Sequence, residues 1–253
     1  MPEPEANHDA DDEPLVVEAP PDVEPEPRRL ISGHISWRRT FSAFQHRNYR
    51  LFFFGMAISL TGTWMQTAAE GWLVYELTNS EFKLGLTRFL HSIPVTLFTL
   101  IGGHLADRSE KRRILIATQF ASMILAFAFA GLVWSGAIQF WHVAILALAL
   151  GLAQAFDIPA RQSFVIELVG KKDLMNAIAM NASMFNGARV FGPALAGLLI
   201  AIPAFGISGC FFFNGLSFLA VIGCYFMMRL PPAKARPKSK SLRRGTMEAL
   251  NYV

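Results

Sequence analysis

Five polar side chains inside long apolar runs have the clearest chemical potential in this sequence. They are Gln66, Glu70, Arg88, Asp157 and Arg189. A charge at bilayer depth costs at least a few kcal/mol, so it is retained where it pairs or serves a function. We interpret these five residues as candidates for a substrate or proton pathway. The alternative is a set of structural salt bridges that hold helices together.

The spacing of these residues places several of them on shared helix faces. Gln66 and Glu70 are four residues apart, and Thr63 lies on the same side. Arg88 and His91, three residues apart, share a face as well. The carboxylates and guanidiniums at this depth can therefore neutralise one another in pairs. Asp157, followed by Arg161, stands at the inner end of an apolar run, where it suits either a gate residue or a helix cap.

Arg189 lies in a stretch of small residues, N-G-A-R-V-F-G-P-A-L-A-G. The small residues that we expect to let two helices approach closely are Ala188, Gly192, Ala196 and Gly197. Pro193 removes a backbone hydrogen bond and predicts a kink in the same helix. Ordinary helix packing is the alternative reading of this pattern.

Six apolar runs must position these side chains. They cover residues 51–74, 84–105, 114–134, 140–156, 177–202 and 209–228. Each is close to the roughly 20 residues that cross a bilayer as a helix. With 53% hydrophobic residues and 22 Phe, the composition is too apolar for a soluble protein of this size. The sequence predicts an all-α integral membrane protein with a bundle of six transmembrane helices.

The distribution of charge predicts the orientation of this bundle. Ten of the 19 acidic residues and none of the 23 Lys and Arg residues fall in the first 27 positions. Of the 23 basic residues, twenty lie in the segments that would face the cytoplasm and one, Lys83, in an outer loop. By the positive-inside rule, both termini are expected to be cytoplasmic. The basic body suits an anionic membrane surface, and we expect no nucleic-acid partner.

The chain divides into four predicted parts. Residues 1–27 form an acidic, proline-rich tail that we expect to be disordered, and residues 28–50 form a basic juxtamembrane segment. Residues 51–228 form the bundle, and residues 229–253 a basic cytoplasmic segment. Cys210 and Cys224 have no companion at metal-ligand spacing, and no hydrolase or metalloprotease motif occurs. We therefore expect no metal, no cofactor and no enzyme activity.

The segment G-H-L-A-D-R-S-E-K-R-R, from Gly103 to Arg113, resembles the loop signature of the major facilitator superfamily. That signature, G-x-L-A-D-R-x-G-R/K-R/K, joins the second and third helices. Residues 41–55, the segment D-I-P-A-R-Q-S-F at 157–164 and Gly192-Pro193 with Gly197 resemble the same superfamily. The similarity is to the N-terminal six-helix half, in the branch that includes the enterobactin exporter and macrolide efflux proteins.

The resemblance implies alternating access and export of a small amphipathic molecule, siderophore or drug-like, with protons as the coupling ion. It implies a gating loop made of Gly103, Asp107, Arg108, Arg112 and Arg113. Two departures matter, and each involves one residue. Glu110 replaces the usual Gly of the loop, and Ala147 stands where many proton antiporters carry Arg in the fourth helix.

Several partners and alternatives follow from the same resemblance. Membrane lipids, a small-molecule substrate and a second six-helix half, in cis or by pairing, are expected. The chain is expected to stop before a seventh helix and to reside, multi-pass, in the bacterial inner (plasma) membrane. An importer of the same fold, or a truncated half that acts only when paired, remains the alternative to an exporter.

Overall fold

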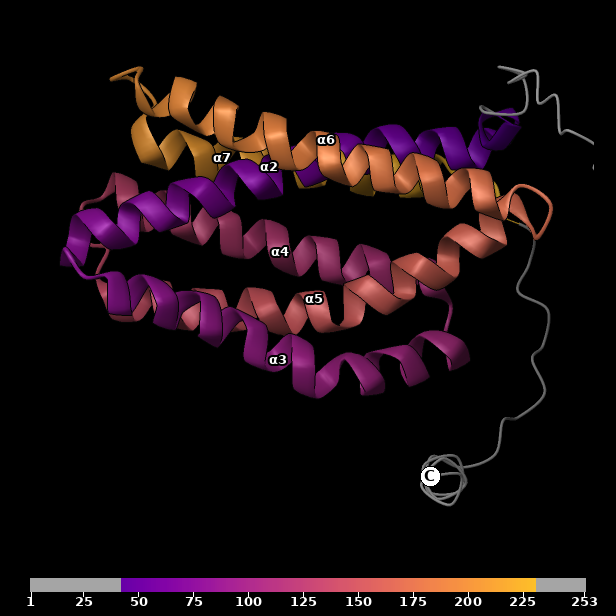
Figure 1. The fold of residues 1–253 in the computed structure, drawn as a ribbon, viewed down its shortest axis with the longest axis horizontal. Helices are drawn as coiled ribbons and strands as arrows, with labels where there is room; N and C mark the ends of the chain where they lie inside the picture. Colours follow the sequence, from indigo (N-terminus) through magenta and orange to yellow (C-terminus); the bar gives the residue numbers. More distant parts are fainter. Residues whose placement is uncertain (1–41, 231–253) are drawn as a thin grey trace, which may run out of the picture. The chain divides into compact units, whose positions relative to one another are not determined.

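Apolar runs of this length form helices because a helix satisfies its backbone hydrogen bonds internally, as a bilayer requires. The computed structural model describes residues 42–230 and consists there of a short 3-10 helix and six long α-helices. They are η1 (Ser42–Gln45), α2 (Arg47–Thr78), α3 (Glu81–Arg108), α4 (Lys111–Trp134), α5 (Phe140–Val169), α6 (Leu174–Ile200) and α7 (Gly206–Met227) (Figure 1). The acidic tail, most of the juxtamembrane segment and residues 231–253 lie outside the described residues.

Each of the six long helices extends beyond the apolar run that predicts it, and the extensions of α2 and α5 bear on the predicted segments. α2 begins at Arg47, so the last part of the basic juxtamembrane segment is already helical. α5 continues from Phe156 through Pro159 to Val169. It continues because one face of this stretch, including Ala160 and Phe164, remains buried after the hydropathy falls. Asp157 is therefore an interior helical residue, and the predicted helix-cap role is wrong.

The hairpin predicted around Asp107 is tighter than the sequence indicates. α3 includes Asp107 and Arg108, and only Ser109 and Glu110 separate it from α4. The turn between α2 and α3 also has two residues: Asn79 adopts φ 45°, and the Ser80 hydroxyl accepts from the Lys83 N–H at 3.4 Å. These two turns fix three consecutive helices as antiparallel neighbours.

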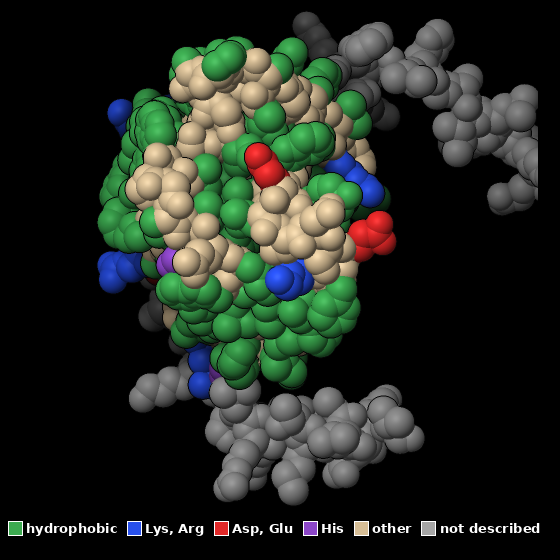
Figure 2. Space-filling view, turned by 90° about the vertical axis from the view of Figure 1, so that its left-hand side faces the viewer, with side chains coloured by type: hydrophobic (Ala, Val, Ile, Leu, Met, Phe, Trp, Pro, Cys, Tyr) green, Lys and Arg blue, Asp and Glu red, His purple; other side chains and the backbone are tan. Residues whose placement is uncertain are grey.

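The alternation of helices gathers the basic side chains at one end of the bundle, called here the basic end (Figure 1, right). Its described Lys and Arg residues are Arg47, Arg50, Arg108, Lys111, Arg112, Arg113, Lys171, Lys172 and Arg229. The opposite end carries the turns at residues 79–80, 135–139 and 201–205. Seen from that end, the surface is mostly hydrophobic or uncharged (Figure 2). The described helices thus have the charge asymmetry that the sequence predicts.

Glycine residues let helices approach closely at several contacts. A Cβ atom on Gly151 of α5 would lie 2.0 Å from the His91 carbonyl oxygen of α3. On the same interface, a Cβ on Gly102 would lie 2.4 Å from the Ala155 carbonyl oxygen. Backbone packs on backbone along α3 and α5, the arrangement that small residues permit between membrane helices.

Two clusters of buried apolar side chains fill the bundle, one toward each end. The cluster near the basic end includes Tyr49, Phe52 and Phe164. The cluster near the opposite end includes Phe129 and Phe211, whose rings stack at 4.7 Å between centroids. Buried polar side chains also occur in α2, α3, α4, α5 and α7.

The outer surface of the bundle is apolar. Exposed side chains of α3, for example, include Phe89, Leu97 and Leu100. Among the described helices, α3, α4, α5 and α7 are long and apolar enough to cross a membrane. α2 and α6, which carry Glu70 and Arg189, are not among these helices. The structure therefore supports an all-helical membrane protein. By length and composition, four of its described helices qualify as membrane spans.

A polar clasp ties the start of α2 to the start of α6 at the basic end. Asp173 accepts hydrogen bonds from the Ser42 hydroxyl at 2.7 Å and pairs with His46 Nε2 at 2.9 Å. The Asn176 amide donates to Ser42 Oγ at 3.0 Å. The hydrogen bond from His46, with that from Ser42, holds the pKa of the Asp173 carboxyl below its usual value. The clasp is thus strongest while Asp173 is ionised.

The close approach of α3 and α5 predicts that Gly151→Ala destabilises the bundle by about 1–3 kcal/mol, because the new methyl group overlaps the His91 carbonyl. The melting temperature of the purified protein in a neutral detergent measures the effect. Gly131→Ala is the matched control, since no atom lies within 4 Å of that Cβ position. Equal melting temperatures for the two variants would contradict the packing described above.

The clasp predicts a pH-dependent contribution to stability. Because the folded-state pKa of Asp173 is lowered, its contribution is present above the unfolded-state value of about 4 and is lost as the pH falls further. Asp173→Asn should lower the melting temperature at neutral pH, and the difference from wild type should shrink near pH 3. Glu76→Gln, exposed near the other end, should show no such convergence. A constant difference at all pH values would be the contrary result.

Candidate functional site

The Asp157 carboxylate is buried among polar partners from two helices. Its Oδ1 accepts from the Thr118 hydroxyl and from the Gln119 amide, both at 2.9 Å. Its Oδ2 lies 3.4 Å from Arg161 Nε, one turn further along α5. Asp157 is only 6% exposed, yet both of its oxygens have partners. This carboxylate is therefore held as a charge-balanced link between α4 and α5.

Gln119 extends this network to α2. Its Oε1 accepts from the Ser59 hydroxyl at 3.3 Å while its Nε2 donates to Asp157. The carboxylate fixes which way the amide points, because only the NH₂ group can donate to it. Ser59, Gln119 and Asp157 thus connect three helices through one chain of hydrogen bonds.

A second polar contact joins α2 to α7. The Asn214 amide donates to Gln66 Oε1 at 2.6 Å, and the Ser217 hydroxyl donates to the Asn214 carbonyl oxygen at 2.8 Å. A Cβ on Gly62 would lie 2.5 Å from Asn214 Oδ1, so α7 can reach α2 here only because position 62 is glycine. Gln66, predicted as a pathway residue, is therefore engaged in holding two helices together.

Glu70 is in a different position from Asp157, although both carboxyl groups are buried. Glu70 is 4% exposed, and its Oε1 is buried without a hydrogen-bond partner in the described part of the chain. The charge that acts on it is that of Arg88 on α3. Arg88 itself donates to the Thr67 carbonyl oxygen of α2 at 2.5 Å. The predicted faces of α2 and α3 therefore meet, with the Glu70 carboxyl incompletely satisfied.

Arg189 contacts an aromatic ring instead of a carboxylate. Its guanidinium lies over the Trp64 ring of α2, 5.7 Å from the ring centroid. The Trp64 ring meets Phe185 of α6 edge to face, with 5.5 Å between centroids. Arg189 itself is exposed, so the expected neutralisation of Arg189 by a carboxylate is not found among residues 42–230.

The predicted gating residues lie at the basic end. Asp107 and Arg108 are exposed in the last turn of α3. Arg112 donates to the Phe226 carbonyl oxygen at 3.2 Å, which links α4 to α7. Arg113 pairs with Glu110 at 2.6 Å, so the residue that departs from the family pattern forms an ion pair within the turn.

One further ion pair of this region connects α4 to α5. The Lys111 ammonium, 5% exposed, pairs with the Glu167 carboxylate. Gly103, by contrast, lies beside α5 with ordinary clearance, since its Cβ position is 3.9 Å from Pro159 Cβ. The gating sequence is thus fastened to α5 and α7 through Lys111 and Arg112.

The small residues of α6 lie on two different faces. Gly192 packs against α2, where a Cβ would lie 2.5 Å from Trp64 Cβ, and Ala188 and Ala196 are buried on the same face. Pro193 is exposed and the helix continues through it. Gly197 is exposed too, with no atom within 4 Å of its Cβ position. The structure therefore brings Gly192, but not Gly197, into the helix contact.

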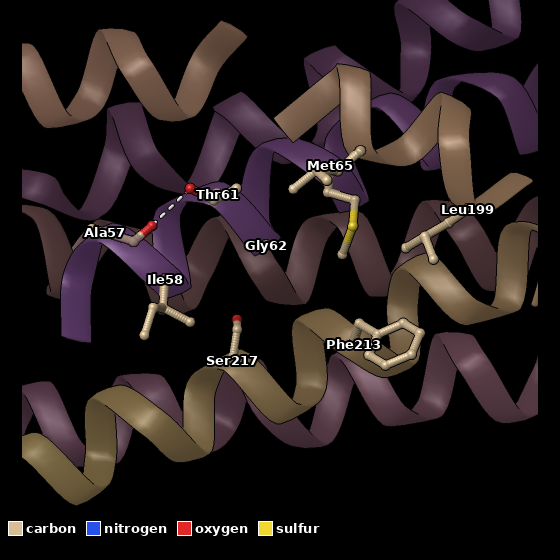
Figure 3. A pocket seen from close by; sticks show the side chains of 9 residues that line it. Ala57, Ile58, Thr61, Gly62, Met65, Leu199, Phe213 and Ser217 are labelled. Atoms are coloured by element: carbon tan, nitrogen blue, oxygen red, sulfur yellow. Dashed lines mark hydrogen bonds between the residues drawn. The ribbon is translucent and has the colours of Figure 1, made fainter. Parts of the chain in front are cut away.

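An apolar groove of about 550 Å³ lies between α2, α6 and α7 (Figure 3). Its walls are Ala57, Ile58, Thr61, Gly62, Met65, Leu195, Leu199, Phe213 and Ser217. The Thr61 hydroxyl donates to the Ala57 carbonyl at 2.8 Å, and that of Ser217 is also bonded within the protein. The groove opens outward beside the exposed Ile58 and Leu195. It presents no charged side chain.

Several residues of the polar interior were not predicted from the sequence. Gln119, Asn214 and Ser59 are neutral, so they do not stand out in apolar runs as charges do. Asparagine and glutamine at bilayer depth obey the same rule as charges, since each needs a partner inside the protein. Within residues 42–230 no group of three or more His, Cys, Asp or Glu side chains could hold a metal ion.

Comparison with known proteins identifies the family to which the chain belongs. The family described as "Transmembrane secretion effector" matches residues 38–253. The chain is 26% identical over 179 residues to the staphyloferrin A transporter of Staphylococcus aureus, covering 70% of this chain and 43% of that protein. It is 26% identical over 211 residues to the multidrug efflux pump Tap of Mycolicibacterium fortuitum, covering 80% and 51%.

A further relative is the enterobactin exporter EntS of Shigella flexneri, 25% identical over 170 residues, which cover 66% of this chain and 40% of the exporter. The matched regions thus span about half or less of each relative's length. No solved structure matches the chain. The predicted resemblance is confirmed, and the family and these relatives are transporters, not enzymes. The chain belongs to the transmembrane secretion effector family of major facilitator transporters.

Proposed function

We propose that this chain forms a six-helix half of a secondary active transporter that exports a small amphipathic molecule by alternating access. The observation that carries the proposal is the family match over residues 38–253. Two of the relatives are, by their names, a multidrug efflux pump and an enterobactin exporter. A second six-helix half, in cis or by pairing, would complete the site, because transporters of this architecture bind cargo between two repeats.

All six long helices cross the membrane in this proposal, with both ends of the chain on the cytoplasmic side. α2 and α6 then place Glu70 and Arg189 at bilayer depth, where hydropathy alone would disfavour them. The burial of Glu70 among the helices of the bundle supports the proposal, as does the collection of Lys and Arg at the basic end. The membrane would be the bacterial inner (plasma) membrane.

Protons are the proposed coupling ion, and Glu70 is the proposed carrier. A carboxyl group that gains and loses a proton during transport cannot be locked by strong donors in one charge state. Asp157 accepts from two hydrogen-bond donors and pairs with Arg161, so both of its oxygens are engaged in structural contacts. Within residues 42–230, one buried oxygen of Glu70 has no hydrogen-bond partner, and the cation Arg88 acts on this carboxyl group. Of the predicted carboxylates, Glu70 therefore suits reversible protonation better.

The gating residues have a proposed role at the basic end. There Lys111 and Arg112 fasten the start of α4 to α5 and α7. The exposed Asp107 side chain would engage the second half, since a carboxylate is favoured at the positive end of a helix. Breaking that contact would open the transporter toward the cytoplasm.

The orientation predicts which loops can be reached from outside the cell. In a background in which Cys210 and Cys224 are replaced by alanine, a membrane-impermeant maleimide should label Ala137→Cys in intact cells. It should label Lys172→Cys only after the membrane is permeabilised. Both positions are exposed, so accessibility is not limited by folding. The opposite labelling pattern would reverse the proposed orientation.

The proposed proton carrier predicts the effect of Glu70→Gln on transport. In everted vesicles that contain the protein in its natural sequence context, adding cargo should dissipate an imposed pH gradient. Glu70→Gln should reduce this by at least tenfold, because the amide cannot carry a proton. Asp107→Ala should slow transport through loss of the gating contact, while Glu76→Gln should match wild type. Undiminished activity in Glu70→Gln would show that Glu70 does not carry the coupled proton. Cargo uptake that occurs in right-side-out vesicles and not in everted vesicles would indicate an importer.

A further inference from the structure

The chemistry of α6 differs sharply between its two flanks. Gly192 marks the line along which α6 packs on α2. At about 100° per residue, Arg189 lies about 60° to one side of that line and Leu195 about 60° to the other. Leu195 and Leu199 line the apolar groove, whereas Arg189 contacts Trp64. One flank is therefore suited to hydrocarbon, and the other carries a full positive charge.

The Arg189 guanidinium is far from both ends of its helix. It lies 11 residues before the end of α6 at Ile200, or roughly 16 Å at 1.5 Å per residue. The start of α6 is further away. Half the hydrocarbon thickness of a bilayer is about 15 Å, so this charge lies close to the membrane midplane. Lipid headgroups are too distant to neutralise it.

No described group satisfies this guanidinium. It has five N–H donors, but its recorded contact is with the face of the Trp64 ring, which accepts no conventional hydrogen bond. No carboxylate within residues 42–230 lies within 4 Å of it. A charge at bilayer depth is retained where it faces a polar pathway or an anion.

The position of the guanidinium is set before any ligand arrives. Gly192 lets α6 approach so closely that a methyl group there would meet the Trp64 side chain at 2.5 Å. Trp64 in turn contacts Phe185, whose ring is 45% exposed. A guanidinium that lies over an aromatic ring keeps its N–H donors available for bidentate binding of a planar anion. Phe185 and Arg189 are four residues apart on α6, so the exposed Phe185 shares a helix face with this arginine.

We propose that Arg189, Trp64 and Phe185 form a binding subsite for small organic anions in which a carboxylate adjoins an apolar or aromatic ring. The guanidinium binds the carboxylate through two parallel N–H donors, and Phe185 covers the adjoining ring. Trp64 positions the guanidinium. The proposal rests on the proposed transport function, because it assigns a negative charge to the transported molecule. Binding alone can test it.

The test uses fluorine NMR with the purified protein in a neutral detergent. The probes are 4-trifluoromethylbenzoate and its neutral counterpart, 4-trifluoromethylbenzamide, and the measurement is the dissociation constant from line broadening. Wild type should bind the benzoate more tightly than the benzamide. Arg189→Gln should weaken benzoate binding at least tenfold and change benzamide binding less than twofold. Arg189→Lys, which keeps the charge but not the planar fork, should fall between them.

Matched variants separate a site from general charge or folding effects. Arg229→Gln removes one positive charge at the exposed basic end and should bind both probes as wild type does. Trp64→Phe should weaken benzoate binding a few-fold. The melting temperature of each variant shows whether it is folded. Benzoate affinity unchanged in Arg189→Gln, or absent in wild type, would overturn the proposal.

The binding test and the transport test fail independently. If benzoate binding depends on Arg189 but the vesicles move no cargo, the anion subsite stands and the transport function does not. The converse result is that vesicles transport cargo while Arg189→Gln binds the benzoate normally. In that case the subsite is refuted and the transport function stands.

Discussion

A carboxylate inside a bilayer must find its counter-charge and its hydrogen-bond donors within the protein, because the surrounding hydrocarbon supplies neither. Asp157 meets this constraint completely, through Arg161 on its own helix and through Thr118 and Gln119 on α4. Because Ser59 donates to Gln119, the same contacts reach α2, and one chain of hydrogen bonds joins three helices.

The remaining polar residues differ in how many hydrogen-bond and charge partners they have. Gln66 accepts a hydrogen bond from Asn214, which links α2 to α7. Within residues 42–230, one oxygen of Glu70 has no hydrogen-bond partner, and the contact of Arg189 is with an aromatic ring. Polar groups with several partners link the helices, whereas the proposed function assigns protons and ligands to the groups with fewer partners. In that proposal the number of partners, more than depth in the membrane, separates structural from functional candidates.

The helices were predictable from the sequence, because runs of bilayer length can satisfy their backbone only as helices. Each described α-helix overlaps one predicted run. The end of α5 was not predictable from hydropathy, which falls at Asp157 while the helix continues on its buried face. Spacing placed Gln66 and Glu70 on one face of α2, but it could not say that one meets an amide and the other an arginine. Neighbours across helices depend on contacts such as that of Gly62 with α7, which no pattern along one helix contains.

The two-residue turns at residues 79–80 and 109–110 have a consequence for how the chain enters a membrane. If all six long helices cross the membrane as proposed, so short a link leaves no room for a loop in water between one helix and the next. α2, α3 and α4 would then enter the membrane as successive hairpins during synthesis. Lys111, Arg112 and Arg113 follow the second turn directly and would be retained on the side of the ribosome. The order of insertion is thus built into the turns, before any contact between distant helices forms.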